Sequence, residues 1–342
     1  MSSKSHPMRI QFALGLLIVL ASCSAAKDVE ISDVALMKRY GDEIRTEDLK
    51  EHLYLLASDV LEGRKTGEKG QKMATNYLTA YYEHLELQAP QDYPEYRQTI
   101  PKDYFRRSSR NDSDNVIAYI LGSEKPEEVV VISAHYDHLG IKGEQVYNGA
   151  DDNASGTSAL MEIAESFKLA LDEGHRPRRS VLFLHLTGEE PGLFGSKYYL
   201  SHPVFSVDNT VTNLNIDMIG RVDKEHKKNP NYVYLIGSDK MSSELHALSE
   251  QVNLTFTELK LDYTFNKDSD PNRFYYRSDH YNFAQRGVPV IFYFNGEHED
   301  YHRPTDTAEK INYELLKTRT ELIFYTAWEL ANRTSRVHVD SR

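Results

Sequence analysis

The sequence predicts a single α/β domain built on a mainly parallel, twisted sheet with helices on both faces. Short, continuous apolar runs alternate with longer amphipathic segments, as in parallel sheets that are covered on both sides. Hydrophobic residues make up 40% of the 342 residues and charged residues 27%, which is enough apolar material for a large core. No repeat, low-complexity tract or convincing linker follows residue 40, so the sequence favours one domain.

The order of the elements follows from periodicity. Apolar residues at helical spacing predict helices over residues 46–58, with Thr46 as N-cap, and over residues 70–87. Residues 88–114 have no clear period and are expected to form a loop or an irregular hairpin. Strands are expected beyond this point, at residues 116–121, 129–134, 181–186, 211–216, 232–236 and 288–294. Helices are expected between and after them, at residues 155–171, 193–200, 242–252, 279–286 and 313–332.

The N-terminal residues predict an export signal. Lys4 and Arg9 precede an apolar run over residues 12–21, which is shorter than the ~20 residues that a membrane-spanning helix needs. The only cysteine, Cys23, ends a Leu-Ala-Ser-Cys sequence that resembles a bacterial lipobox, where cleavage precedes a cysteine that then carries a lipid. Alternatively, Cys23 lies in a discarded leader that is cut at the Ser-Ala-Ala sequence following it.

The lipobox interpretation gives the expected organisation of the chain. A lipoprotein signal peptide would occupy residues 1–22, a polar tether 23–40, the folded domain 41–335 and a tail 336–342. The protein would then be exported and anchored to a membrane through a lipid on Cys23, facing the periplasm or the cell surface.

The charge balance and the cysteine count exclude some classes of binding partner and of metal site. The chain has 40 basic and 52 acidic side chains and a formal net charge of −12, which argues against sequence-independent binding to nucleic acid or anionic lipid. A single cysteine excludes an internal disulfide framework and a zinc site built from several cysteines.

Side chains that can bind metals lie at or beyond the ends of four expected strands. In chain order they are His135, Asp137, His138, Glu189, Glu190, Asp217 and, a loop further on, Tyr301 and His302. The pair Asp151-Asp152 lies just before the expected helix at 155–171. Ligands of open α/β sheets bind at the carboxyl ends of the strands, so one metal site is expected at this edge. Histidine mixed with carboxylate favours zinc or a similar divalent ion, and two such ions can activate a water for hydrolysis.

Each motif also has an ordinary structural interpretation when it is taken alone. Asp151-Asp152 could cap the following helix, Glu189-Glu190 could be a solvated acidic pair, and His302 could be a loop histidine. Their common order at strand ends favours the metal interpretation.

Other residues near the expected ligands are assigned supporting roles. Asp151 is expected to shape the backbone, and His138 to support the fold or the surroundings of the ligands. The Ser-Asp-His segment at 278–280 is expected to form pocket wall, because three consecutive side chains cannot face one another as a triad. Residues near Tyr275 and Tyr293 are expected to line a substrate pocket.

Five motifs occur in one order: His135-x-Asp137, Gly-Ala-Asp-Asp152-Asn-Ala-Ser-Gly, Gly-Glu189-Glu190-x-Gly-Leu-x-Gly-Ser, Asn-x-Asp217-Met-Ile-Gly and Tyr301-His302-x-x-x-Asp306. Together they resemble the di-zinc aminopeptidases, the leucyl-type enzymes that bacteria secrete. The stretch from Leu-Ala-Ser-Asp59 to Gly-Arg64 resembles the N-terminal segment of that family, so the likeness covers about residues 50–330. It implies that the domain at 41–335 is a zinc exopeptidase.

The resemblance also implies a ligand set. His135 and Asp217 would bind one zinc ion, and Glu190 and His302 the other. Asp152, the second acid of its pair, would bridge the two ions. The implied cofactor is therefore Zn²⁺, two per chain.

Three further roles follow from the same resemblance. Glu189 would act as the general base that takes a proton from water, and Asp137 would orient His135. Tyr301 would donate a hydrogen bond to the oxyanion. The implied reaction is hydrolysis of the N-terminal peptide bond of a peptide or protein, with no nucleic-acid partner; the sequence leaves the oligomeric state open.

Two alternatives stay open at this point. The first is a glutaminyl cyclase-type zinc acyltransferase, which has the same fold and keeps one metal. The second is a non-catalytic surface binding protein with a relic site. The Asp-Asn-Ala-Ser-Gly sequence favours the peptidase over the cyclase, and the complete ligand set with Glu189 argues against a relic.

Overall fold

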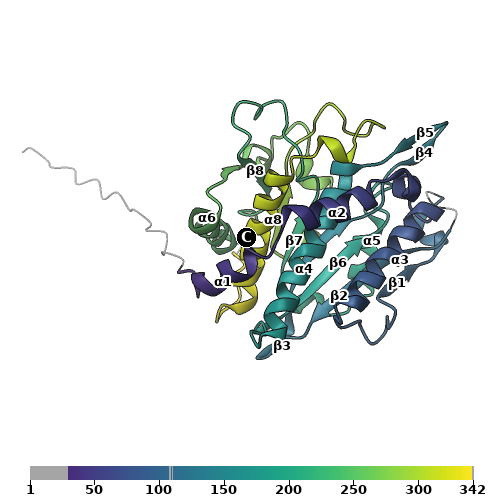
Figure 1. Cartoon of the computed structure of the whole chain (residues 1–342). Helices are drawn as coiled ribbons and strands as arrows, with labels where there is room; N and C mark the ends of the chain where they lie inside the picture. Colours follow the sequence, from purple (N-terminus) through teal and green to yellow (C-terminus); the bar gives the residue numbers. More distant parts are fainter. Residues whose placement is uncertain (1–29, 108, 110, 341–342) are drawn as a thin grey trace, which may run out of the picture.

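A computed structural model describes residues 30–107, 109 and 111–340 (Figure 1). Its centre is an eight-stranded sheet with strand order β1-β2-β6-β3-β7-β10-β8-β9, and β4 and β5 form a separate hairpin. The strands are β1 Arg97–Ile100, β2 Ser113–Ile120, β3 Lys125–His135, β4 Gly140–Lys142, β5 Gln145–Tyr147, β6 Arg179–Leu186, β7 Thr210–Ile216, β8 Tyr232–Ile236, β9 Lys260–Asp262 and β10 Val290–Phe294.

The central strands β6, β3, β7 and β10 run parallel to one another, and β8 pairs in parallel with β9. Strands β1, β2 and β8 join their neighbours β2, β6 and β10 in antiparallel pairs. The predicted α/β class with a mainly parallel sheet is therefore confirmed. The four central strands are buried over most of their length, which is why they are continuous apolar runs in the sequence.

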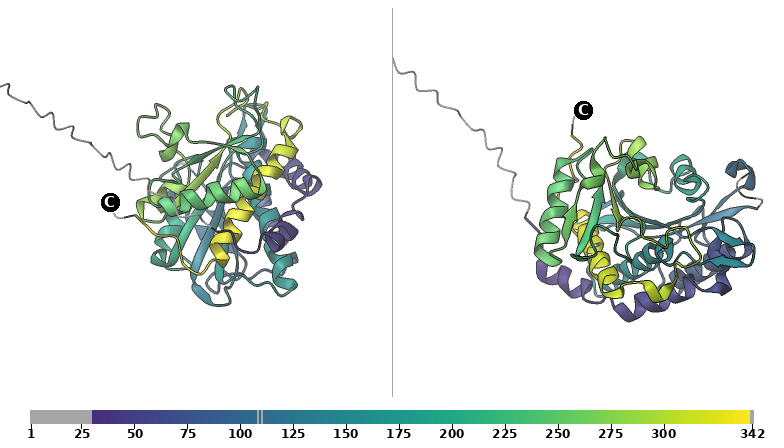
Figure 2. Two further views of the ribbon diagram at one scale, coloured as in Figure 1. Left: turned by 90° about the vertical axis from the view of Figure 1, so that its left-hand side faces the viewer. Right: turned by 90° about the horizontal axis from the view of Figure 1, so that it is seen from above.

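Helices cover both faces of the sheet. They are α1 Val34–Gly41, α2 Thr46–Leu56, α3 Lys69–His84, α4 Gly156–Asp172, α5 Phe194–Ser201, α6 Ser243–Phe256, α7 His280–Gln285 and α8 Tyr313–Asn332. Alternate residues of β3 divide between two cores: Val130 and Ile132 pack with α1–α4, α6 and α8, whereas Val129 and Val131 pack with α5 and α7. Figure 2 shows α1–α3 and α8 gathered on one side of the sheet.

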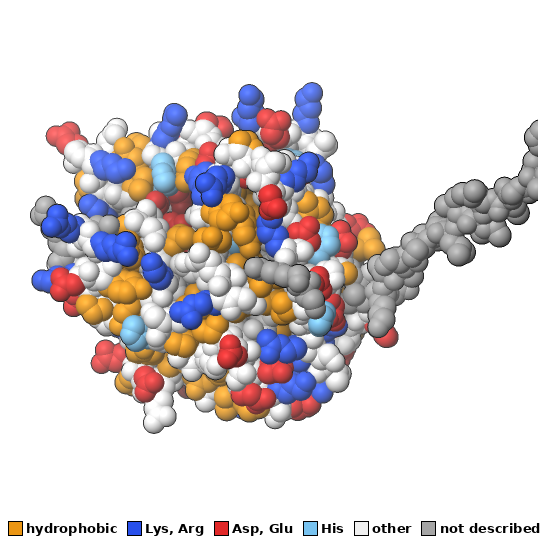
Figure 3. All heavy atoms as spheres, turned by 180° about the vertical axis from the view of Figure 1, so that it is seen from behind, with side chains coloured by type: hydrophobic (Ala, Val, Ile, Leu, Met, Phe, Trp, Pro, Cys, Tyr) orange, Lys and Arg blue, Asp and Glu red, His pale blue; other side chains and the backbone are white. Residues whose placement is uncertain are grey.

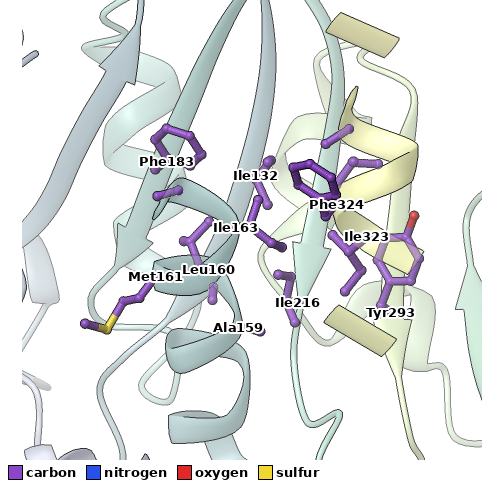
Figure 4. Close-up of a cluster of buried hydrophobic side chains, with 14 of the residues drawn as sticks. Ile132, Ala159, Leu160, Met161, Ile163, Phe183, Ile216, Tyr293, Ile323 and Phe324 are labelled. Atoms are coloured by element: carbon purple, nitrogen blue, oxygen red, sulfur yellow. The ribbon is translucent and has the colours of Figure 1, made fainter. Parts of the chain in front are cut away.

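The larger core is densely aromatic where α4 and α8 meet. Phe167 of α4 contacts Phe324 and Trp328 of α8, with ring centroids 5.2 and 5.4 Å apart. Ile132 of β3 and Phe183 of β6 point into the same cluster (Figure 4). This packing fixes α4 against the sheet and so positions the loop at its N-terminal end.

One local prediction was wrong. Thr46 is the first residue of α2 rather than its N-cap, and its hydroxyl donates to Glu314 at the start of α8. Of the two forms expected for 88–114, the structure shows the hairpin, because β1 pairs with the first residues of β2 in antiparallel orientation. The buried face of β1 is only partly apolar: Ile100 is buried, and so is Gln98, which is hydrogen-bonded to Asn115 of β2.

The expected tether at 23–40 overlaps the fold. Residues 34–41 form α1, whose Met37 and Tyr40 are fully buried. Tyr40 also donates to Glu173 at the end of α4, at 2.7 Å. The expected signal peptide and Cys23 lie outside the described residues. Among the residues that the structure describes, no helix is both long and apolar enough to cross a bilayer.

Candidate metal centre

The predicted ligands converge at the carboxyl edge of the sheet. His135 is the last residue of β3, and Asp217 follows the last residue of β7. Register keeps these ends level, because His135 pairs with Leu186 of β6, and Ser133 pairs with Asn215 of β7. The parallel sheet therefore delivers side chains from distant parts of the sequence to one place.

One group of metal-capable side chains contains His135, Glu189 and Asp217, whose ligand atoms all lie within 4.8 Å of one another. The Nε2 atom of His135 is 3.3 Å from Oδ1 of Asp217. The other carboxylate oxygen, Oδ2 of Asp217, accepts a hydrogen bond from Ser278 at 2.6 Å, and Ser278 accepts from Asn215 at 2.9 Å. The segment 278–280 thus contributes a hydroxyl that orients a ligand, in addition to forming a wall.

A second group contains His138, Asp152 and Glu190. His302 adjoins it, with Nε2 3.1 Å from Oδ2 of Asp152 and 3.4 Å from Oε2 of Glu190. The other oxygen of Asp152, Oδ1, is 3.4 Å from Nε2 of His135 in the first group. Asp152 therefore presents one carboxylate oxygen to each group.

His138 lies closer to the centre than the sequence indicated. Its Nδ1 atom is 2.7 Å from Oε1 of Glu190 and 3.7 Å from Oδ2 of Asp152. Burial lowers its pKa to about 4, so the ring is neutral at pH 7 and can offer a lone pair. The motif His135-Tyr-Asp-His138 carried this signal, because His138 comes only three residues after His135, the last residue of β3.

The donor set fits divalent cations. Burial, together with neighbouring carboxylates, raises the pKa values of Glu189 and Glu190 well above their usual range. Among the described residues, Oε1 of Glu190 and both ring nitrogens of His138 are buried without a well-formed hydrogen bond. Carboxylate and imidazole donors clustered in this way are the ligands that zinc prefers when no thiolate is present.

The carboxylate of Asp137 positions the backbone of Glu189. Its Oδ1 atom accepts from the backbone N–H of Glu189 at 3.2 Å, and its Oδ2 accepts from the Thr66 hydroxyl at 2.6 Å. The distance from Oδ1 to Nδ1 of His135 is 3.9 Å. The carboxylate therefore positions the Glu189 backbone by hydrogen bonding and lies beside His135 without a direct hydrogen bond to it.

The loop that carries Asp152 is fixed by its own motif residues. The Asn153 side chain donates to the Ile216 carbonyl at 2.8 Å and accepts from the backbone N–H of Met218 at 3.1 Å, so it joins the loop to the end of β7. A Cβ atom at residue 156 would lie 2.7 Å from the Ile216 oxygen, which explains the glycine there. The sequence Asn-Ala-Ser-Gly is thus a scaffold for the ligand.

Two buried acids anchor the same loop. Asp306 accepts from the backbone N–H groups of Asp151 and Asp152, at 3.0 and 3.2 Å. Asp151 accepts from the backbone N–H of Gly220 at 2.6 Å and lies 3.1 Å from Nε2 of His298. The prediction that Asp151 shapes the backbone is consistent with these contacts, because they are directed away from both metal-capable groups.

Arg64 is a supporting residue whose role the sequence did not reveal. Its guanidinium is fully buried and donates to the carbonyl groups of Leu56, Tyr136, Asn148 and Gly149. Burial lowers its pKa to about 10, so it stays charged at pH 7, close to four site carboxylates. It therefore joins the two ligand-bearing loops and supplies a fixed positive charge beneath them.

A cavity with a partly apolar wall adjoins the first group. Its apolar part is formed by Met218, Phe274, Phe292 and Phe294, and the rest of its wall is polar or charged and includes Glu189, Tyr301, Arg277 and Glu297. The predicted pocket residues are offset by one position, because Tyr293 itself is buried in the core and its two neighbours line the cavity.

Tyr301 lies at the mouth of this cavity. Its ring stacks on His302 with centroids 3.9 Å apart, and its hydroxyl lies 3.3 Å from a guanidinium nitrogen of Arg277. Burial raises the pKa of Tyr301, so the phenol stays protonated and can donate.

Comparison with known proteins identifies the family. The profile of peptidase family M28 matches residues 115–327, which is more than half of the chain. The chain belongs to peptidase family M28. The matched residues include all five predicted metal ligands.

Curated relatives agree with this membership. A "Probable zinc metalloprotease" of Pyricularia oryzae is 28% identical over 263 residues, covering 65% of this chain and 51% of the relative. "Aminopeptidase YwaD" of Bacillus subtilis is 25% identical over 231 residues, covering 64% of this chain and 45% of the relative. This chain thus spans about half the length of the curated relatives that it matches.

Solved structures share the fold. The LapA aminopeptidase of Legionella pneumophila superposes with a TM-score of 0.69 at 20% identity, covering 90% of this chain and 78% of the other. A glutaminyl cyclase of Bacteroides thetaiotaomicron superposes with a TM-score of 0.62 at 16% identity, covering 84% and 98%. The fold is therefore common to both chemistries, and the site has to separate them.

Proposed function

We propose that this M28 chain is an aminopeptidase that uses two zinc ions to hydrolyse N-terminal peptide bonds. His135 and Asp217 would hold one ion, Glu190 and His302 the other, and Asp152 would bridge them. The observation that carries the proposal is the position of Asp152, which directs one oxygen toward His135 and the other toward His302. Such an arrangement suits a pair of cations that share a carboxylate.

The zinc ions, when bound, supply positive charge that acidifies a water and polarises the scissile carbonyl. Glu189 would take the proton of that water on its carboxylate and later deliver it to the leaving amine. Its location supports this role, because its backbone is held by Asp137 while its side chain lines the cavity. Tyr301 would donate to the carbonyl oxygen as negative charge develops there, which its protonated phenol allows.

The apolar cavity would receive the side chain of the first residue of the substrate. Its Met218 and phenylalanine walls suit an apolar side chain, and its contact with His135 and Asp217 places that residue beside the metal centre. The leucine aminopeptidase names among the relatives are consistent with this choice of substrate.

The proposal is tested by measuring whether hydrolysis of an aminoacyl nitroanilide depends on bound zinc. We expect hydrolysis of leucine p-nitroanilide by protein carrying two zinc ions per chain, loss of that hydrolysis after chelation, and recovery on addition of zinc. Protein with full zinc content that hydrolyses none of a panel of aminoacyl nitroanilides would contradict the proposal.

Glutaminyl cyclase activity is the second candidate, because the cyclase fold is shared. Two separate groups of ligands favour a two-metal hydrolase over an enzyme that keeps one metal. Peptides that begin with glutamine distinguish the two: release of free glutamine supports the aminopeptidase, and loss of ammonia with a pyroglutamyl product supports the cyclase.

We also propose that the protein is an exported lipoprotein anchored through Cys23, on the basis of its lipobox-like sequence. The Cys23→Ser variant is expected to leave the membrane fraction and to migrate without the lipid-dependent shift. Unchanged processing and membrane partitioning of this variant would contradict the lipid anchor.

A further inference from the structure

A second hollow lies on the other side of the metal centre. It has a volume of about 230 Å³, and its walls are provided by Glu190 and His138 of the second group, the β4–β5 hairpin and the loop before α3. The cavity with aromatic walls borders the centre through other residues, namely His135, Asp152, Glu189, Asp217 and His302. The two hollows share no lining residue, so they adjoin the centre through different side chains.

One part of the wall of this hollow is apolar. Leu139, Ile141 and Pro191 face it, and Ile141 of β4 is 48% exposed, so its side chain is accessible to a bound group. The hairpin lies close to the rest of the wall because residue 140 is a glycine, where a Cβ atom would lie 2.6 Å from the Cβ of Lys65.

Two basic side chains complete the wall. Lys65 and Lys142 both line the hollow, and neither ammonium group has a carboxylate within 4.0 Å among the described residues. The ammonium of Lys142 lies 4.5 Å from the ring centroid of Tyr147 in β5, which holds it on the hairpin. Two unpaired cations beside Glu190 are a distinctive feature in a site otherwise dominated by carboxylates.

The course of a peptide through the proposed active site decides what this hollow receives. If the first side chain fills the aromatic cavity and the scissile carbonyl lies between the two metal-capable groups, the chain has to continue past Glu190. The residue after the scissile bond therefore enters the hollow, where the apolar wall contacts its side chain.

We propose that this hollow binds the residue that follows the scissile bond of a short peptide, and that Lys65 and Lys142 bind a carboxylate on it. The inference rests on the proposed aminopeptidase function. The carboxylate is the C-terminal group of a dipeptide or the acidic side chain of the second residue, and both offer the same chemistry. Short peptides with a free carboxylate at this position are the substrate class that this site selects.

Matched pairs of substrates test the proposal. Leu-Ala is compared with Leu-alaninamide for the terminal carboxylate, and Leu-Glu-amide with Leu-Gln-amide for the side chain. We expect the wild-type kcat/KM to favour the charged member of at least one pair by about fivefold or more, and to do so less at high salt, because exposed ion pairs are screened. The ratio is measured within one protein, so a general loss of activity cancels.

The decisive variant is the double substitution Lys65→Met and Lys142→Met, which keeps the apolar stems and removes both charges. We expect the ratio in the favoured pair to fall to about one. The matched control is Lys224→Met with Lys228→Met, two exposed lysines outside both hollows, and it should keep the wild-type ratio.

The inference is overturned if wild-type protein shows no preference in either pair, or if the double variant keeps the preference. Failure of the proposed function has a different signature. In that case wild-type protein cleaves neither the peptides nor any aminoacyl nitroanilide, and the inference fails with it.

Discussion

At the scale of single residues, the centre depends on one buried cation. Arg64 donates to four backbone carbonyl groups, in the segment before α3 and in the two loops that carry His135 and Asp152, and its positive charge lies close to four acidic side chains. Removing it leaves buried carbonyl oxygens without donors and carboxylates without compensation.

The Arg64→Met variant tests this dependence. We expect it to lower the free energy of unfolding by about 3 kcal/mol or more and to weaken zinc binding, because buried polar partners are left unpaired. Urea denaturation and zinc titration measure the two effects. Arg176→Met, at an exposed arginine with a single carbonyl contact, is the control and should change stability by less than about 0.5 kcal/mol. An unchanged midpoint for the Arg64 variant would refute the role.

A second residue-scale prediction concerns acid stability. His185 of β6 is fully buried, and Nε2 lies 2.7 Å from the Tyr82 hydroxyl; burial lowers its pKa to about 3. The ring stays neutral in the folded state but gains a proton below about pH 6.5 in the unfolded chain. Its contribution to stability is therefore full above pH 6.5 and is lost as pH falls toward 3.

The His185→Gln variant isolates this effect. Between pH 7.5 and pH 5, wild-type protein should lose about 2 kcal/mol more of its unfolding free energy than the variant, since each pH unit below 6.5 costs about 1.4 kcal/mol. Unfolding free energies are measured by denaturant titration at each pH. An equal loss of stability in the two proteins would show that the pKa of His185 does not differ between the folded and unfolded states.

At the scale of elements, α1 belongs to the folded domain although its sequence suggested a tether. Its fully buried Met37 and Tyr40 pack into the larger core, and Tyr40 contacts Trp328 of α8 with ring centroids 5.4 Å apart. The helix has only eight residues, which is too short to be stable by itself, so its contacts with the core show that it is ordered.

Truncation of α1 side chains measures this contribution. We expect Met37→Ala to destabilise the protein by about 2–5 kcal/mol, the range for large-to-small changes in a core. The control is Val34→Ala in the same helix, where the valine is 41% exposed, and we expect a change below about 0.5 kcal/mol. Equal, small effects of the two substitutions would show that α1 does not contribute to the stability of the domain and belongs to the tether.

The central elements were predictable because burial on both faces leaves long apolar runs. The strands at 129–134, 181–186 and 211–216 were placed within a few residues of β3, β6 and β7. Strand β1 was expected only as part of a loop or irregular hairpin, because one of its two buried positions is a glutamine that is satisfied by hydrogen bonds instead of apolar contact. Periodicity detects hydrophobic burial and cannot detect buried polar pairing.

The ligands of the site were predictable from the sequence, whereas the residues that support them were not. The convergence of these ligands followed from their positions at strand ends, in the loops after strands or just before a helix, and the structure brings all five together: His135, Asp152, Glu190, Asp217 and His302. The roles of Arg64 and Ser278 were not predictable, because their bonds reach segments far away in the sequence and depend on the final packing.

At the scale of the whole molecule, the acidic surplus has two locations. Part of it lies in the buried carboxylates of the metal centre, where it is matched by bound cations in the proposed function. The rest is on the surface, and on the face in Figure 3 basic and acidic side chains are interspersed with apolar ones. The net charge of −12 therefore describes the site as well as the solvent-exposed surface.

The central claim is that Glu189 moves the proton in a site that holds two zinc ions. The Glu189→Gln variant tests it most directly, with zinc per chain and turnover of leucine p-nitroanilide measured on the same preparation. The account predicts about two zinc ions per chain in variant and wild type alike, with kcat reduced about 10²–10⁴-fold in the variant. A variant that keeps its zinc and hydrolyses the substrate at the wild-type rate would contradict it.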